Sequence, residues 1–371
     1  MEGQDSCCKG LLIVAELGLG PNSEPFPGST GPKLHLFDIA PPLQYDLKPF
    51  ATMSLAPYID GVLHVKFLRP NAIEGIGSDE LWAVASGGFA TNVAGGVVLV
   101  NLTNIVRDYR SFGANLTVLR SSDVLVLSTP VLQPEGVIVD SSNSFVYVGG
   151  INSTSLGVIN VTNPAAAALI NVQADVGMQL VGAKMSDQPK WPEYSTVTRI
   201  DGDCSGCGND DGIIFFASWG GKGKLIAVDT MGERNAAAPV VIGETEYWRE
   251  ASLRMANRVK LLFTTTQDGG QTHWAYDLAL LPLETRIGGF AVVNISDISD
   301  RSNSTDISLP VLRTVHVPLY EIKESTNLNS KAYCLAVSST RYVYLFIAET
   351  STVFIYDLDA ITQSPSSLEN I

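Results

Sequence analysis

The stretch Gly289-Phe-Ala-Val-Val-Asn294-Ile-Ser296 is the clearest copy of a pattern that five further stretches of the chain repeat. In each stretch a run of apolar residues ends at Asp or Asn, and another apolar residue follows. The other five are Lys33–Ala40, Val97–Thr103, Leu156–Thr162, Lys224–Thr230 and Thr352–Asp359. The Asp or Asn residues follow one another at intervals of 63, 59, 69, 65 and 63 residues. This regular spacing indicates a structural unit that is repeated along the chain.

Each repeated stretch is short, rich in Val, Ile, Leu, Phe and Tyr, and bounded by turn-forming residues, which predicts a β-strand. Another apolar strand precedes each one across a Gly-rich or polar turn, so every unit contains a central hairpin. The expected hairpin partners are Leu11–Glu16, Leu81–Ser86, Phe145–Gly149, Ile213–Ser218, Leu261–Thr266 and Tyr342–Ala348.

Flanking apolar segments supply two more strands for most units, and helical periodicity is nearly absent. Opening strands are expected at Gly61–Phe67, Gly136–Asp140, Ser195–Ile200, Ala251–Ala256 and Ala332–Val337. Closing strands are expected at Ala51–Leu55, Val124–Ser128, Leu169–Ala174, Val240–Glu244 and Val311–Val317. The first unit has no opening strand in this assignment, and the last unit has no closing strand.

Four antiparallel strands per unit, repeated radially, predict an all-β fold, namely a β-propeller. The six units predict six blades in a single domain over residues 1–371. Seven blades are the alternative, because the long stretch 164–211 has room for irregular strands. Either the two ends of the chain complete one blade together, or the 371 residues are a module of a longer chain.

Two of the repeated stretches, Gly289–Ser299 and Gly157–Pro164, are close to a known pattern. They resemble LVIVD repeats, whose strand reads roughly Gly-x-Leu-x-Val-x-Asp-Ile-Ser-Asp-Pro. The resemblance touches all six units and is close in two or three. It implies a β-propeller fold and an extracellular or cell-surface location, because such repeats occur largely in secreted and cell-surface proteins. It implies no catalytic residues.

The Asp or Asn that ends each repeated strand has a structural explanation. A short acceptor side chain at a strand end can accept a hydrogen bond from the backbone N–H two residues later, which forms an Asx-turn. We therefore expect these side chains to start the following loop rather than to bind a ligand.

The composition excludes several classes of partner. The chain has 38 acidic and 24 basic residues and a net charge of -14, whereas nucleic acids and anionic membranes attract a basic surface. No apolar run reaches the roughly 18 residues of a membrane span. The polar, acidic first residues fit a cytosolic chain or the mature part of a secreted precursor. We expect protein or glycan partners, no nucleic acid and no insertion into a membrane.

Six Asn-x-Ser/Thr sequons are candidate N-glycosylation sites. Three of them coincide with the Asn of the repeat, which itself favours Ser or Thr two residues later: Asn101, Asn160 and Asn294. The other three lie in expected loops and are the better candidates: Asn115, Asn152 and Asn303.

The five cysteines favour disulfides over a metal site. Cys204 and Cys207 lie in one expected loop, so we interpret them as a loop-closing disulfide of an oxidising compartment. A free or redox-active pair and a metal site are the alternatives. Cys334 can pair with Cys7 or Cys8 and so join the two ends of the chain. A structural zinc site would need a second spaced pair or a neighbouring His, and neither is present.

Two groups of acidic residues are candidate calcium sites, which makes calcium the candidate cofactor. One is the loop around the cysteine pair, where Gly residues accompany several oxygen ligands of the kind that calcium prefers. Its candidate ligands are Asp201, Asp203, Asn209 and Asp211. The loop lacks the EF-hand spacing, and a solvated acidic loop is the alternative.

The second candidate calcium site lies at the start of the expected opening strands. Four of these strands begin with an acidic residue: Asp60, Glu135, Glu193 and Glu250. The first strand of a propeller blade lines the central channel, so these carboxylates would ring one channel mouth. Six-bladed lactonases and related hydrolases use such a channel calcium to polarise a carbonyl. They add Asn ligands and a general base, which the sequence does not identify. A solvent-facing acidic rim is the alternative.

The leading hypothesis for function is a non-enzymatic, extracellular or cell-surface module that binds proteins or glycans through the rims and loops of the propeller. No Gly-x-Ser-x-Gly motif is present, and no His lies in a recognisable triad context. The rival hypothesis is a calcium-dependent hydrolase or lactonase with its metal at the channel mouth. A third is an intracellular scaffold, which would have free thiols and unmodified sequons.

Overall fold

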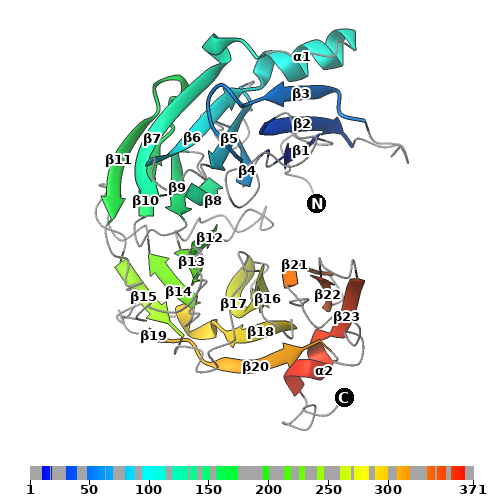
Figure 1. Ribbon diagram of the computed structural model, residues 1–371. Helices are drawn as coiled ribbons and strands as arrows, with labels where there is room; N and C mark the ends of the chain where they lie inside the picture. The colour runs from blue at the N-terminus through cyan, green and yellow to red at the C-terminus, as the bar shows by residue number, and fades with distance from the viewer. Residues whose placement is uncertain are drawn as a thin grey trace, which may run out of the picture. The chain divides into compact units, whose positions relative to one another are not determined.

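A computed structural model gives the arrangement of the strands (Figure 1). It describes residues 11–16, 18, 31–39, 48–62, 64–69, 80–87, 94–113, 119–132, 134–139, 144–150, 156–173, 195–199, 213–218, 225–229, 240–245, 260–268, 271–283, 289–299, 307–317, 332–338, 341–347 and 352–363.

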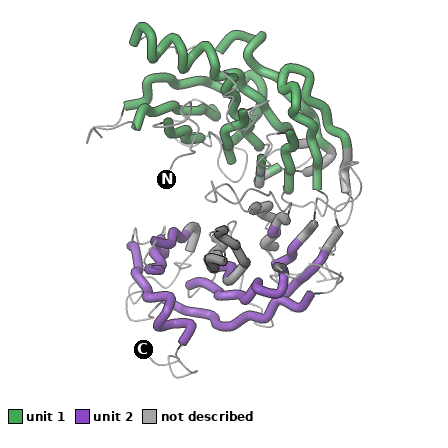
Figure 2. Tube along the Cα trace, turned by 180° about the vertical axis from the view of Figure 1, so that it is seen from behind, with its two compact units in different colours: residues 1–176, 201–212, 233–238 green, residues 177–200, 213–232, 239–371 purple. Residues whose placement is uncertain are grey.

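The chain forms two compact units, each of which contains three small sheets in the described residues (Figure 2). Unit 1 comprises residues 1–176, 201–212 and 233–238, and unit 2 comprises residues 177–200, 213–232 and 239–371. Within each sheet, strands that follow one another in the sequence are hydrogen-bonded neighbours, and their pairing is antiparallel. A single short parallel pairing, between β15 and β19, is described in unit 2.

Unit 1 holds the first three sheets. The β1–β3 sheet consists of β1 (Leu11–Glu16), β2 (Lys33–Asp38) and β3 (Ala51–Ser54). The β4–β7 sheet consists of β4 (His64–Leu68), β5 (Trp82–Gly87), β6 (Ala94–Asn101) and β7 (Val124–Leu132). The β8–β11 sheet consists of β8 (Pro134–Val139), β9 (Phe145–Gly150), β10 (Leu156–Asn160) and β11 (Ala168–Gln173).

Unit 2 holds the other three sheets. The β12–β15 sheet consists of β12 (Ser195–Arg199), β13 (Ile213–Ser218), β14 (Leu225–Asp229), β15 (Val240–Glu244) and the short β19 (Ile307–Ser308). The β16–β20 sheet consists of β16 (Lys260–Asp268), β17 (Gln271–Pro282), β18 (Gly289–Asn294) and β20 (Val311–His316). The β21–β23 sheet consists of β21 (Ala332–Val337), β22 (Tyr342–Ile347) and β23 (Thr352–Asp357).

Apolar side chains on both faces of a sheet bind neighbouring sheets together. In unit 1, Ala83 of β5 belongs to a buried core with Leu36 of the β1–β3 sheet, and the adjacent Val84 belongs to a core with Val146 of the β8–β11 sheet. Successive residues of a strand point to opposite faces, so the β4–β7 sheet is covered on both sides.

The same alternation recurs in unit 2. Leu281 of β17 shares a core with Phe215 of the β12–β15 sheet, and Leu280 shares another with Leu345 of the β21–β23 sheet. Small antiparallel sheets that are consecutive in sequence and pack face to face are the blades of a β-propeller. The expected all-β, β-propeller fold class is therefore confirmed.

Most expected strands are confirmed, and the fifth unit is the exception. Five of the six central hairpins pair as expected, but β18 pairs with β17 and not with the expected partner Leu261–Thr266, which lies in β16. The reason is a second tight turn, since Asp268 pairs with Gln271 and makes β16 and β17 a hairpin of their own. The opening strand expected at Ala251–Ala256 lies outside the described residues.

Two short α-helices were not expected. Helix α1 (Thr103–Phe112) follows β6, buries Ile105 and Val106, and stacks Tyr109 on Phe50 with ring centroids 3.9 Å apart. Helix α2 (Leu358–Gln363) follows β23 and accepts a hydrogen bond at the Ile361 carbonyl from Arg313 of β20. Short 3-10 turns cover Ser121–Asp123, Pro164–Ala166 and Ser296–Ser299. Within the described part of the chain, no helix has the length and apolar character of a membrane span.

The expected Asx-turns are present in four of the six units. In these units the Oδ1 atom of the repeat's Asp or Asn accepts a hydrogen bond from the backbone N–H two residues later. The pairs are Asn101 with Thr103 (3.0 Å), Asn160 with Thr162 (3.0 Å), Asn294 with Ser296 (2.9 Å) and Asp357 with Asp359 (3.0 Å). The repeat's polar residue therefore starts the loop that leaves each of these strands.

Two replacements of Asn160 distinguish the effect of this turn on stability from the effect of glycosylation. Asn160→Ala removes both the acceptor oxygen and the sequon, and we expect it to lower the free energy of unfolding by about 1 kcal/mol, as for a lost local cap. Asn160→Asp removes the sequon but keeps the oxygen, so its stability should stay near that of the wild type. Denaturant unfolding measures the difference, and equal losses in the two variants would contradict the turn assignment.

Candidate functional site

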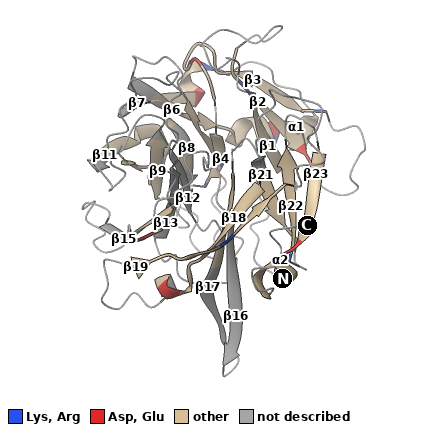
Figure 3. Cartoon of the chain, turned by 60° about the horizontal axis from the view of Figure 1, so that its bottom comes forward, with Lys and Arg blue, Asp and Glu red and all other residues tan. Residues whose placement is uncertain are grey.

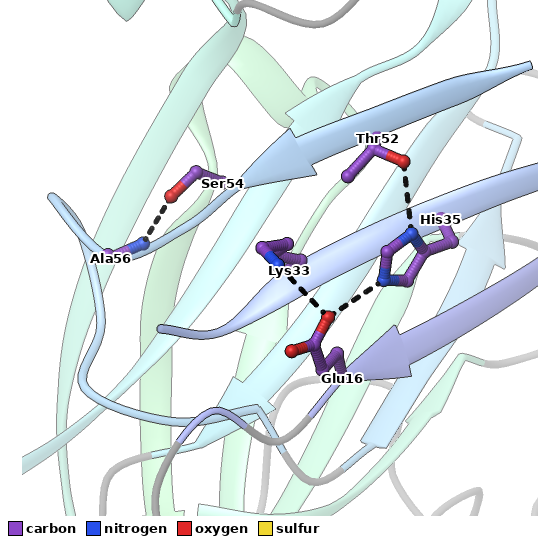
Figure 4. Close-up of polar contacts among 6 residues, drawn as sticks. All are labelled: Glu16, Lys33, His35, Thr52, Ser54 and Ala56. Carbon is purple, nitrogen blue, oxygen red and sulfur yellow. Dashed lines mark hydrogen bonds and ion pairs between the residues drawn. The ribbon is translucent and has the colours of Figure 1, made fainter. Parts of the chain in front are cut away.

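A hydrogen-bonded polar cluster lies on one face of the β1–β3 sheet (Figure 4). Leu34 and Leu36 of β2 are fully buried in the core of unit 1. The alternate residues Lys33 and His35 therefore point to the opposite face of the sheet. Their neighbours on that face come from the edge strands, and we call Glu16, Lys33, His35 and Thr52 the polar cluster.

His35 is the centre of the polar cluster. Its Nδ1 atom lies 3.0 Å from the Thr52 hydroxyl oxygen on β3, and its Nε2 atom lies 3.1 Å from the Glu16 Oε2 atom on β1. Lys33 donates a hydrogen bond to the same Oε2 atom over 3.3 Å. The three strands are thus linked across the face by side chains as well as by their backbone ladder.

The electrostatics of the polar cluster keep Glu16 ionised. The hydrogen bond from His35 lowers the pKa of the Glu16 carboxyl, and the hydrogen bond and positive charge of Lys33 lower it further, while partial burial opposes them. The Glu16 side chain is 37% exposed, so solvent screens these interactions. The result is a fixed carboxylate that neighbouring side chains hold in one orientation.

Two apolar residues adjoin the polar cluster on the same face. Leu12 and Val14 lie four and two residues before Glu16 on β1, so the three side chains point to the same face. Leu12 and Val14 are each 40% exposed. Val14 pairs directly with His35 across the β1–β2 ladder. The face therefore combines partly exposed apolar side chains with hydrogen-bonded polar groups.

The polar cluster also has the order of groups of a nucleophilic site. If the imidazole donates its Nε2–H to Glu16, its Nδ1 accepts a hydrogen bond from the Thr52 hydroxyl, which gives the order hydroxyl, base and orienting carboxylate. The order matches that of nucleophilic hydrolases. The polar cluster can thus act as a binding surface or as a weak nucleophilic site.

The structure describes two of the four residues of the expected channel-mouth ring. Asp60 is half-buried in the segment between β3 and β4, and the backbone of Glu135 lies in β8. Glu193 and Glu250 lie outside the described residues. Among the residues that are described, no group of three or more His, Cys, Asp or Glu could hold a metal ion. The calcium ring stays a prediction.

The structure also does not describe the acidic loop or most of the cysteines. The whole of the loop with Asp201, Asp203, Cys204, Cys207, Asn209 and Asp211 lies outside the described residues, as do Cys7 and Cys8. The backbone of Cys334 lies in β21, where it pairs with Phe346 of β22. The loop calcium site and the disulfides therefore also stay predictions.

The structure describes three of the six sequons. The three at the repeat position are half-buried and start Asx-turns: Asn101, Asn160 and Asn294. The three loop candidates lie outside the described residues: Asn115, Asn152 and Asn303. Glycosylation of all six stays a prediction.

Sequence reasoning did not single out the polar cluster. Its signal was the alternation of polar Lys33 and His35 with apolar Leu34 and Leu36, which marks one face of β2 as polar. The partners Glu16 and Thr52 lie 19 and 17 residues away from His35. Only the antiparallel register of three strands reveals that they are neighbours.

No family model matches the chain, and no curated protein matches it. Several solved structures are similar to it. One is a periplasmic gluconolactonase from Pseudomonas aeruginosa (12% identity, 83% of this chain and 86% of that chain, TM-score 0.39). Another is a putative 6-phosphogluconolactonase from Bacteroides fragilis (10% identity, 99% and 96%, TM-score 0.39). A third is Sqt1 from Saccharomyces cerevisiae (10% identity, 94% and 72%, TM-score 0.43). Similarity at this level transfers no activity and no residue role.

The lowered pKa of Glu16 predicts how its contribution to stability depends on pH. Because the pKa is lower in the folded than in the unfolded chain, the stabilisation is complete above the unfolded value of 4.5 and is lost as pH falls through the folded value. We expect Glu16→Gln to lower the free energy of unfolding at pH 7 and to have a smaller effect at pH 3.5.

Denaturant unfolding at the two pH values tests this prediction. Glu80→Gln, at an exposed carboxylate outside the polar cluster, is the matched control. An equal effect of Glu16→Gln at both pH values would show that the His35 and Lys33 contacts do not stabilise the fold.

Proposed function

We propose that this chain is a non-enzymatic interaction module, a six-bladed propeller of the LVIVD-repeat type that acts outside the cell or at its surface and binds proteins or glycans. The observation that carries the proposal is the open face of the β1–β3 sheet, where exposed Leu12 and Val14 adjoin the polar cluster.

The polar cluster lowers the cost of binding at this face. Side chains that become ordered on association cost about 0.5–1.5 kcal/mol each. Glu16, Lys33 and His35 already hold one another in place through hydrogen bonds of 3.1–3.3 Å. A partner can therefore hydrogen-bond to oriented groups while it covers Leu12 and Val14.

A protein loop is the partner that suits this face best. The carboxylate of Glu16 accepts hydrogen bonds from backbone or side-chain N–H groups, and the ammonium of Lys33 donates to carbonyl oxygens. A protein loop offers both kinds of group next to small apolar side chains. The partner that we propose is therefore a protein, with glycans as the alternative from the sequence.

The blade number and the location have separate support. Six repeats in the sequence and six small sheets in the described residues support six blades. The loop sequons and the Cys204–Cys207 pair support an oxidising, glycosylating compartment. Calcium remains the proposed cation for the acidic loop and for the channel-mouth carboxylates.

Photo-crosslinking at Val14 tests the binding face. The full chain carrying p-benzoylphenylalanine at position 14 is irradiated on intact source cells, and Leu312, an exposed apolar residue of β20, is the control position. We expect discrete protein adducts from position 14 only. Excess unlabelled wild type should suppress them, and Val14→Asp should compete about tenfold less well, as for the loss of a central contact.

Two results would overturn the binding proposal. One is the same adducts from positions 14 and 312, or equal competition by Val14→Asp, which would mean non-specific contact. The other is the absence of adducts together with hydrolysis of p-nitrophenyl esters that Thr52→Ala and His35→Ala abolish. That second result would favour a hydrolase with Thr52 as the nucleophile and His35 as the base, which differs from the calcium-dependent hydrolase expected from the sequence.

Peptide mass spectrometry of the unreduced protein from its natural source tests the location. We expect glycans at Asn115, Asn152 and Asn303 and a bridge between Cys204 and Cys207. Bare asparagines and free thiols would contradict the extracellular proposal and favour the intracellular scaffold.

A further inference from the structure

The repeat gives each sheet a comparable end point. In five sheets the second strand begins at the residue that pairs with the Asp or Asn of the repeat. These pairs are Leu11–Asp38, Trp82–Asn101, Phe145–Asn160, Ile213–Asp229 and Tyr342–Asp357. In the β16–β20 sheet the equivalent pair is Leu278–Asn294, but β17 begins earlier, at Gln271. Residues 271–277 therefore extend beyond the end point that the other sheets share.

The extension is a two-stranded ribbon. Strands β16 and β17 stay paired from Phe263–Tyr276 to Asp268–Gln271. No described strand pairs with this part of β17 on the side of β18. We call residues 263–268 and 271–276 the β16–β17 ribbon. Because the second strands of the other five sheets stop at the point where the ribbon starts, the ribbon is not part of the faces by which stacked sheets cover one another.

The register gives the β16–β17 ribbon two different faces. Directly paired residues share a face, and consecutive residues of a strand alternate between faces. One face, which we call the aromatic face, holds the pairs Phe263–Tyr276, Thr265–Trp274 and Gln267–Thr272. The other face holds the pairs Thr264–Ala275, Thr266–His273 and Asp268–Gln271. The Phe, Trp and Tyr residues of the ribbon thus share one face, and its Asp and His lie on the other.

We propose that the aromatic face of the β16–β17 ribbon binds an uncharged oligosaccharide. Aromatic rings offer flat apolar surfaces on which the C–H face of a sugar ring packs, and Thr and Gln supply donors and acceptors for sugar hydroxyls. The aromatic face combines both kinds of group and has no Leu, Ile, Val or Met. Trp274 and Tyr276 lie two residues apart, about 7 Å along the strand, so they serve two consecutive sugar units.

The charge of the β16–β17 ribbon disfavours anionic ligands. Residues 261–277 include Asp268 and Asp277 but no Lys or Arg. Nucleic acids and sulfated or sialylated glycans require a basic surface. The neighbouring strand β18, drawn in tan in Figure 3, has no charged residue either. The ligand class that fits is therefore a neutral chain of hexoses or N-acetylhexosamines.

A glycan array tests the proposal. The full chain, fluorescently labelled, is applied to immobilised neutral oligosaccharides and to a sulfated and sialylated set. The many copies in each spot make weak binding detectable. We expect binding to a subset of the neutral oligosaccharides and none to the anionic set. Calorimetric titration with the best-bound oligosaccharide then gives the affinity in solution.

Substitutions on the two faces of the ribbon identify the site. Trp274→Ala should weaken binding at least about tenfold, as for the loss of a central aromatic contact. Trp274→Phe keeps an aromatic ring and should weaken binding less. His273→Ala, at the adjacent residue on the opposite face, is the matched control and should bind like the wild type. Far-ultraviolet circular dichroism checks that each variant is folded. Oxidative labelling of the wild type needs no substitution, and the bound oligosaccharide should protect Trp274.

Failure of neutral oligosaccharides to bind, equal binding by Trp274→Ala, or equal labelling of Trp274 with and without the oligosaccharide would overturn the proposal. Loss in Trp274→Ala of the protein adducts formed from position 14 would assign the ribbon to a protein partner and would also overturn it. The inference extends the proposed binding function to a second site, in unit 2, whereas the polar cluster lies in unit 1. Absence of adducts from position 14 in the wild type contradicts the proposed binding face alone, because the sugar titration does not depend on it.

Discussion

The structure depends on one constraint: a small antiparallel sheet with apolar side chains on both faces is stable only when both faces are covered. In the β4–β7 sheet, Ala83 and Val84 are consecutive residues, and each is fully buried on a different side. A sheet of this design cannot fold as an isolated layer, because either orientation would expose one apolar face. The sheets must therefore stack.

The first and last sheets each have one face in a core that the structure describes. The side chains of their other faces are partly exposed, and these two faces differ in chemistry. The β1–β3 sheet presents charged and hydrogen-bonding groups around His35, whereas the β21–β23 sheet presents aromatic residues of β22 such as Tyr344.

Much of the fold could be predicted because apolar alternation and turn residues act locally. Stretches such as Leu156–Asn160 carry both signals within a few residues, and their strands and hairpin partners followed. Strand β17 was not predicted from the sequence, because Asp277 interrupts its run of apolar residues and hides the pattern of a single strand. The tight turn after Asp268 was the signal that could have revealed it.

Features that depend on distant contacts could not be predicted. Helix α1 has apolar residues at helical spacing, namely Ile105, Val106, Tyr109 and Phe112, but the pattern covers only ten residues. Its packing depends on Phe50, which lies 59 residues before Tyr109. Its Gly113 cap, in the left-handed conformation, was the local clue. The polar cluster likewise required the register of three strands. For the acidic loop and the paired cysteines, the sequence remains the basis of the assignment.

The Asx-turns have a consequence for how this surface changes in evolution. The turn depends on one oxygen atom, which Asn and Asp both carry, whereas glycosylation enzymes require the amide nitrogen, which only Asn carries. A single base change converts one residue into the other. At Asn101, Asn160 and Asn294 the repeat can therefore gain or lose a sequon while the strand end keeps its geometry. The turn and the sequon can thus change independently at the same residue.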